Sequence, residues 1–140
     1  MRYNNLGASG LMVSELSFGC MTFTEGGGFL GKAGMVGVEG AYEMMKTAYE
    51  HGVNFFDNAE AYGGAGVSEK IMGEAIKLGM GQGLWERADL VISTKIFFGG
   101  RAGKDTINSL GLSRKHLYEG TKASLERMQL EYVDLLFCHR

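Results

Sequence analysis

Proline is absent from this chain of 140 residues, and cysteine occurs only twice. The two cysteines, Cys20 and Cys138, are far apart in the sequence and form neither a C-x-x-C pair nor a cluster with histidine. A disulfide framework or a metal centre built on cysteine would need such spacing. We therefore expect two reduced thiols and no metal site.

The chain also has little positive charge and no long apolar run. Its formal net charge of -2 argues against a protein that neutralises phosphates, so nucleic acid is not an expected partner. No segment approaches the roughly 20 apolar residues of a membrane span, and no apolar signal core follows the first residues. A hydrophobic content of 45% with 21% charged residues is typical of a globular domain, and we expect a cytoplasmic location without membrane insertion.

Strand and helix patterns alternate along the chain. Residues 2–15 resemble a short β-hairpin with its turn at residues 8–10. Gly52 occupies a position typical of a left-handed helix cap, and Ser68 and Ser113 can each cap the start of a helix. The expected strands are 16–19, 53–57, 90–95 and 133–139, and the expected helices are 41–49, 68–76 and 113–128.

Two of these helices show an apolar face at helical spacing. The expected inward-facing residues are Ile71, Met72, Ala75 and Ile76 in the first of them, and Leu117, Thr121, Leu125 and Met128 in the second.

Short apolar strands that alternate with helices predict a parallel sheet with right-handed crossovers. Both an open doubly wound sheet and a closed barrel fit this order. The G-x-G-x-x-G motif of dinucleotide-binding open sheets is absent between the first strand and the first helix, which favours a barrel. A complete (β/α)₈ barrel takes about 250 residues. We therefore expect an α/β fold that is the N-terminal half of a TIM-type parallel (β/α) barrel, with about four β/α units after a short β-hairpin.

The glycine-rich residues 26–37 are expected to form a loop. Residues 26–32 match the G-x-x-x-x-G-K part of a phosphate-binding loop, but Ala33 stands where a Ser or Thr would hold magnesium. Because such a match arises easily in a glycine-rich segment, a mobile active-site flap is the better interpretation.

Four residues with acid, base or cationic side chains lie at or just after expected strand ends. Asp57, Lys95 and His139 end three successive strands, and Tyr62 follows on the loop after Asp57. Each residue alone has a structural explanation, as a cap, a solvated strand end or a packing aromatic. Reactive residues of β/α barrels gather at the carboxyl ends of the strands, so their joint placement favours a catalytic site.

The sequence around these residues resembles that of a known family. The runs 54–62 (NFFDNAEAY), 93–95 (STK) and 134–140 (DLLFCHR) are similar to successive signatures of the aldo-keto reductases. The runs 1–7, 95–100 and 111–116 further resemble the branch that contains the β subunits of voltage-gated potassium channels. The resemblance covers nearly the whole chain, so residues 1–140 are expected to be the N-terminal part of a single aldo-keto reductase barrel domain.

The resemblance implies an NADPH-dependent oxidoreductase that reduces aldehydes or ketones to alcohols. Tyr62 would be the general acid that protonates the carbonyl oxygen. Lys95 would stabilise the phenolate electrostatically, and Asp57 would hold the ammonium by a charge-assisted hydrogen bond. His139 would orient the carbonyl by donating a hydrogen bond. Some channel-associated members carry asparagine instead, so the histidine favours a competent reductase.

The family also implies contacts to NADPH from Cys20, Met21 and Asp57. Cys20 and Met21 depart from the channel branch, which usually has a tryptophan nearby. In the family most groups that bind the NADPH phosphates come from later strands. His51 and His116, at a helix end and a helix start, are expected to be structural or solvated.

Three functions stay open at this stage. The leading one is a reductase that acts on a small carbonyl substrate, with this chain as part of it. The second is a regulatory β subunit that binds a potassium channel α subunit. The third is a truncated half barrel without activity that associates with itself, because exposed strand edges and apolar helix faces favour pairing.

Overall fold

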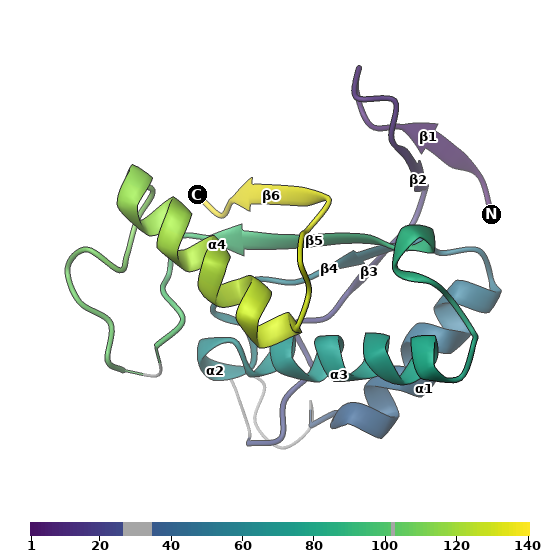
Figure 1. Ribbon diagram of the computed structural model, residues 1–140, viewed down its shortest axis with the longest axis horizontal. Helices are drawn as coiled ribbons and strands as arrows, with labels where there is room; N and C mark the ends of the chain where they lie inside the picture. Colours follow the sequence, from purple (N-terminus) through teal and green to yellow (C-terminus); the bar gives the residue numbers. More distant parts are fainter. Residues whose placement is uncertain (27–34, 102) are drawn as a thin grey trace.

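A computed structural model describes residues 1–26, 35–101 and 103–140, and its elements follow the expected alternation (Figure 1). In chain order they are β1 (Tyr3–Asn5), β2 (Met12–Ser14), β3 (Ser17–Gly19), α1 (Val38–Glu50), β4 (Phe55–Asp57), α2 (Tyr62–Ala65), α3 (Val67–Gly81), a 3₁₀ helix (Arg87–Asp89), β5 (Val91–Ile96), α4 (Arg114–Met128) and β6 (Leu135–Cys138).

The predicted hairpin is confirmed. Strands β1 and β2 pair antiparallel, with Tyr3 opposite Ser14, and Gly10 in the connection has a φ of +78°. Asn54, just before β4, connects the hairpin to the sheet by hydrogen bonds. Its Oδ1 accepts from the Ser14 amide at 2.8 Å, and its Nδ2 donates to the Met12 carbonyl at 3.1 Å. The hairpin therefore lies at the end of the sheet where the strands begin (Figure 1).

The remaining strands form one parallel sheet in the order β3-β4-β5-β6. Each strand pairs with the next one along the chain, with Gly19 opposite Asp57 and Asp57 opposite Ser93. This order is that of the first half of a (β/α) barrel, so the predicted fold class is confirmed. Within the described residues the sheet is open, since β3 and β6 are its two edges and do not pair with each other.

The three long helices lie along one side of the sheet (Figure 1). Helix α1 packs on α3, and α3 packs on α4. Side chains from the helices and the strands share one apolar core, which removes apolar surface from water and stabilises the sheet-and-helix layer. Fully buried members of this core include Met45, Phe56, Met72, Ile76, Ile92 and Met128.

Two predicted helix ends are confirmed. Helix α1 ends before Gly52, whose φ of +89° is the left-handed conformation expected there. Helix α4 begins after Ser113, whose hydroxyl accepts from the His116 amide at 3.1 Å. His51, beside Gly52, has its Nδ1 atom 2.8 Å from the Thr47 carbonyl oxygen, so its role is structural.

The prediction that Ser68 caps a helix is wrong. Helix α3 begins at Val67 after Gly66, which has a φ of +80°, and no side chain caps it. Ser68 lies inside the first turn, fully buried, and its hydroxyl donates to the Cys20 carbonyl at 2.6 Å. The hydroxyl therefore satisfies a buried acceptor from a distant part of the chain.

The predicted inward face of α4 is only partly right. Met128 is buried, but Leu117, Thr121 and Leu125 are half-buried. The fully covered stripe instead consists of His116, Gly120, Ser124 and Met128. The two residues in the middle of this stripe, Gly120 and Ser124, are small, and α4 approaches closely there: a Cβ atom on Gly120 would lie 3.1 Å from Oε2 of Glu60 and 3.2 Å from Cδ1 of Ile96.

The glycine-rich segment is described only at its two ends. Thr24 and Val36 form an isolated antiparallel bridge. The flap interpretation of residues 26–37 and the discounted phosphate-loop match both concern residues 27–34, which lie outside the described residues.

Candidate active site

The structure brings the four predicted catalytic residues to the carboxyl ends of the strands. Asp57 is the last residue of β4, Lys95 is the second to last of β5, and His139 directly follows β6. Tyr62, expected on a loop, begins the short helix α2, in which Gly63 and Gly64 have non-helical dihedral angles. The parallel register places these strand ends side by side, as the sequence predicts.

Lys95 occupies the centre of the group. Its Nζ atom lies 2.6 Å from Oδ2 of Asp57, and both side chains are mostly buried, with 16% and 24% of their surfaces exposed. The same ammonium donates to the Asn58 carbonyl at 2.7 Å and lies 4.7 Å from the centre of the Tyr62 ring. At this distance the ammonium is within cation–π range of the Tyr62 ring.

Two residues that the sequence analysis did not assign support this arrangement. Ser93 is fully buried, and its hydroxyl donates to Oδ1 of Asp57 at 2.6 Å. Asn58, also fully buried, contributes the carbonyl that accepts from Lys95. Ser93 could have been identified from the sequence. It lies two residues before Lys95 in the 93–95 run, and alternation along a strand puts both side chains on one face.

The His139 ring contacts two aromatic side chains. It packs edge-on against Tyr62, with ring centres 5.7 Å apart, and against Phe98, at 5.0 Å. Its Nδ1 atom is buried without a hydrogen-bond partner among the described residues. Burial, with smaller contributions from the positive charges of Lys95 and Arg140, lowers the pKa of His139 below its ordinary value. The imidazole is therefore neutral near pH 7 and can donate one hydrogen bond.

Cys20 and Met21, predicted together with Asp57 to contact a cofactor, differ in their surroundings. Cys20 is fully buried, and its Sγ atom lies 3.6 Å from the Met72 sulfur. Burial raises the pKa of this thiol far above its ordinary range, so it stays protonated. The amide and carbonyl of Cys20 bond to Asp57 and Ser68. The Met21 side chain, in contrast, has 45% of its surface exposed.

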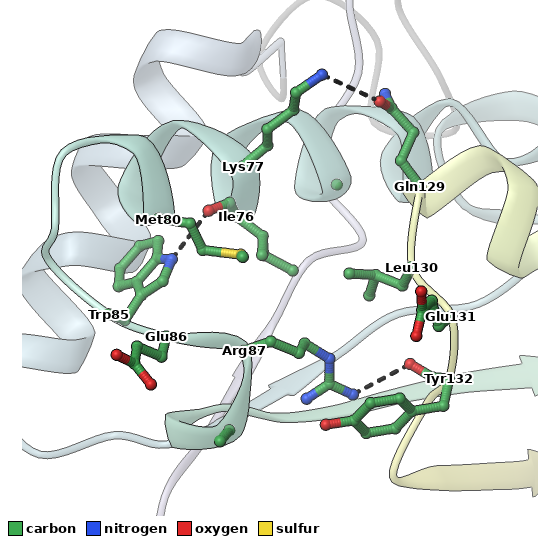
Figure 2. Close-up of a pocket in the computed structure, with 12 residues that line it drawn as sticks. Ile76, Lys77, Met80, Trp85, Glu86, Arg87, Gln129, Leu130, Glu131 and Tyr132 are labelled. Carbon is green, nitrogen blue, oxygen red and sulfur yellow. Dashed lines mark hydrogen bonds between the residues drawn. The ribbon is translucent and has the colours of Figure 1, made fainter.

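A separate pocket of about 800 Å³ lies at the opposite end of the sheet, before the starts of β5 and β6 (Figure 2). The Arg87 guanidinium beside it donates to Asp134 at 2.8 Å and to the Tyr132 carbonyl at 3.1 Å. This pocket contains none of the four predicted catalytic residues, so it is not the predicted active site. Its apolar lining includes Ile76, Met80, Trp85 and Leu130.

Residues 1–26, 35–101 and 103–140 contain neither a metal-binding cluster nor a membrane-spanning helix. Within these ranges, His, Cys, Asp and Glu side chains form no group of three or more suited to a metal ion. The helices described there are all too short or too polar to cross a lipid bilayer.

Comparison with known proteins agrees with this geometry. Residues 15–140 match the model of the "Aldo/keto reductase family". A protein of Arabidopsis thaliana described as a "Probable voltage-gated potassium channel subunit beta" is 51% identical over 142 residues, which is 100% of this chain and 38% of that protein. A protein of Oryza sativa subsp. japonica with the same description is 44% identical, again over 38% of its length.

A solved structure gives the same result for the fold. The holo form of an aldo-keto reductase from Bacillus halodurans superposes with a TM-score of 0.72 at 30% sequence identity. The match covers 97% of this chain and 39% of that protein. This chain thus corresponds to well under half of each relative.

Proposed function

Because the chain belongs to the aldo/keto reductase family, a family of oxidoreductases, we propose that it carries the proton-transfer residues of an NADPH-dependent aldehyde or ketone reductase. The observation that supports this proposal most directly is the position of Lys95. Its ammonium contacts the Asp57 carboxylate and faces the Tyr62 ring. A buried cation held at a phenol is what acid catalysis by tyrosine requires near neutral pH.

In this proposal Tyr62 donates its phenolic proton to the oxygen of the substrate carbonyl. Lys95 stabilises the phenolate that remains, and Asp57, itself fixed by Ser93, keeps the ammonium in place. His139, as a neutral imidazole, orients the carbonyl by donating a hydrogen bond. Proton transfer by a positioned group of this kind contributes about 10²- to 10⁴-fold to the rate.

The described residues fit one end of a nicotinamide cofactor. Met21 is exposed and Asp57 has a partly exposed carboxylate, and we propose that these two lie beside the reacting ring, with Cys20 supporting them from the core. The cofactor would supply the hydride that reduces the carbonyl carbon. NADPH rather than NADH is proposed from the family resemblance, and the phosphate-binding groups are proposed to lie outside residues 1–140.

The decisive test is a reductase assay on the protein expressed from its complete reading frame. We expect NADPH absorbance at 340 nm to fall when an aldehyde such as 4-nitrobenzaldehyde is added. The Tyr62→Phe variant should lose this activity by roughly 100-fold or more and retain its affinity for NADPH, because one hydroxyl carries the proton. Turnover by Tyr62→Phe at the wild-type rate would refute the assignment.

A second candidate function is supported by the two plant relatives, both described as probable channel β subunits. We propose that the protein also binds the cytoplasmic part of a potassium channel α subunit, which places it in the cytoplasm. Co-purification with the cytoplasmic tetramerisation domain of such a channel tests this role. Absence of binding at micromolar concentrations would remove it and leave the reductase proposal unaffected.

A further inference from the structure

Glu60 is a carboxylate with no role in the proton transfer described above, yet it is almost completely buried. Only 1% of its surface is exposed, and it lies two residues before Tyr62. Its Oε1 atom accepts from the amides of Phe97, at 2.7 Å, and Gly99, at 2.9 Å. Its own amide donates to the Lys95 carbonyl at 3.1 Å. Glu60 therefore connects the segment that carries Tyr62 to the segment that follows β5.

His116 on α4 completes a closed set of contacts around this carboxylate. Its Nε2 atom lies 3.2 Å from Oε2 of Glu60, and its Nδ1 lies 2.7 Å from the Gly111 carbonyl oxygen. The Gly111 amide in turn donates to the Phe97 carbonyl at 2.7 Å. Because a carbonyl can only accept, Nδ1 is the donor in its contact with Gly111. His116 is therefore structural, in agreement with one of the two alternatives from the sequence.

The two amides bound by Glu60 flank Phe98 directly. Phe98 packs edge-on against His139 at 5.0 Å, and His139 also packs edge-on against Tyr62 at 5.7 Å. A carboxylate that accepts two amides fixes the backbone on both sides of one residue, and hydrogen bonds to a charged acceptor are stronger than neutral ones. The backbone of Phe98 is thus held by a hydrogen bond at the residue before it and at the residue after it.

We propose that Glu60 is a positioning residue for His139, which acts by holding Phe98 against the imidazole ring, with His116 fixing the carboxylate from behind. The catalytic meaning of this role rests on the proposed function, since His139 is the residue that would orient the carbonyl. The positioning itself rests on the contacts of Glu60, Phe98 and His116.

Two substitutions at one position separate the hydrogen bonds of Glu60 from its charge. Glu60→Gln removes the charge but keeps an oxygen that can accept from the amides, whereas Glu60→Ala removes both. In Glu60→Ala we expect hydrogen exchange at the Phe97 and Gly99 amides to accelerate by about tenfold or more relative to Glu60→Gln. Glu43→Ala, at an exposed position of α1, is the matched control and should leave both amides unchanged.

Titration of His139 by NMR gives a readout that a general loss of stability would not move. Burial is the largest cause of its lowered pKa, so freeing Phe98 should admit water and raise that pKa. We expect a higher value in Glu60→Ala than in Glu60→Gln, which carry the same charge at position 60. Phe98→Ala changes a partly exposed residue and should raise the pKa of His139 in the same direction. It therefore tests the same proposal if Glu60→Ala fails to fold.

Kinetics on the protein expressed from its complete reading frame separate this inference from the proposed function. If both hold, Glu60→Ala lowers kcat by about tenfold or more and leaves the dissociation constant of NADPH unchanged. If the wild type reduces no carbonyl compound while the His139 titration shifts as expected, the positioning stands and the reductase proposal falls. An identical His139 pKa in the two Glu60 variants, or in Phe98→Ala and wild type, would overturn the positioning role.

Discussion

Lys95 and Asp57 form a 2.6 Å ion pair across two adjacent parallel strands. The register explains why they meet. Asp57 lies opposite Ser93, and Lys95 is two residues further along the same strand, so alternation places Ser93 and Lys95 on one face. Thr94, between them, points the other way and donates to Glu69 of α3 at 2.5 Å. Two residues of the predicted catalytic group therefore belong to the sheet itself.

The first prediction concerns the charge of Lys95. Lys95→Met removes the cation beside the Tyr62 ring, and we expect kcat/KM for aldehyde reduction to fall by roughly 100-fold or more. Lys77→Met, at an exposed position on α3 near the opposite end of the sheet, is the control and should keep wild-type activity. Equal activity of the two variants would show that Lys95 takes no part in catalysis.

Ser93 and Thr94 allow the second prediction, because both are fully buried and point in opposite directions. Ser93→Ala and Thr94→Val each remove one hydrogen bond to a carboxylate and should lower the free energy of unfolding by about 1–3 kcal/mol in urea titrations. Only Ser93→Ala frees Asp57, so only it should lower kcat, by about tenfold. If Thr94→Val lowered kcat by a similar factor, the loss of kcat in both variants would be explained by reduced stability alone.

The third prediction is a pH dependence from His139. Its folded pKa lies below its ordinary value of 6.5, so below about pH 6.5 the unfolded chain takes up a proton that the folded chain does not. The free energy of unfolding should therefore fall as pH decreases through this window. His139→Asn lacks the group, and urea titrations between about pH 7.5 and 5.5 should show a shallower decrease. Parallel curves for the two proteins would contradict the buried, neutral imidazole.

The fourth prediction tests the contact between α3 and α4. A Cβ atom on Gly73 would collide with the backbone of Met128, where neither side can yield easily. We expect Gly73→Ala to lower the free energy of unfolding by about 1–3 kcal/mol. Gly81→Ala, in the same helix with open space around it, should be neutral or stabilising by up to about 1 kcal/mol. Thermal unfolding of both variants measures the difference, and equal melting temperatures would argue against close packing.

Features that depend on neighbouring residues could be predicted from the sequence. The hairpin, the helix end at Gly52 and the Ser113 cap each depend on a few adjacent residues, and the structure has all three. The parallel order of the strands followed from the alternation of patterns, and it places Asp57, Lys95 and His139 at neighbouring strand ends without further information.

Features that depend on remote partners could not be predicted. Ser68 carries a capping side chain, but the Cys20 carbonyl, 48 positions away, takes its hydroxyl. The covered face of α4 includes Gly120 and Ser124, and an apolar pattern cannot identify a face that packs closely through small residues. The burial of Glu60 could not be predicted from the residues around it, because its partners, Phe97, Gly99 and His116, come from later in the chain.

The sequential strand order has a consequence for how the protein is made. Each strand of the parallel sheet after β3 pairs with the strand before it in the chain, so every pairing needs only residues that have already been synthesised. Synthesis at about 5–20 residues per second leaves several seconds between successive strands. We expect β3 and β4 to pair in their final register while the chain is still on the ribosome, before β5 has been synthesised. Asp57 would then be in position before Lys95 is available to form the ion pair.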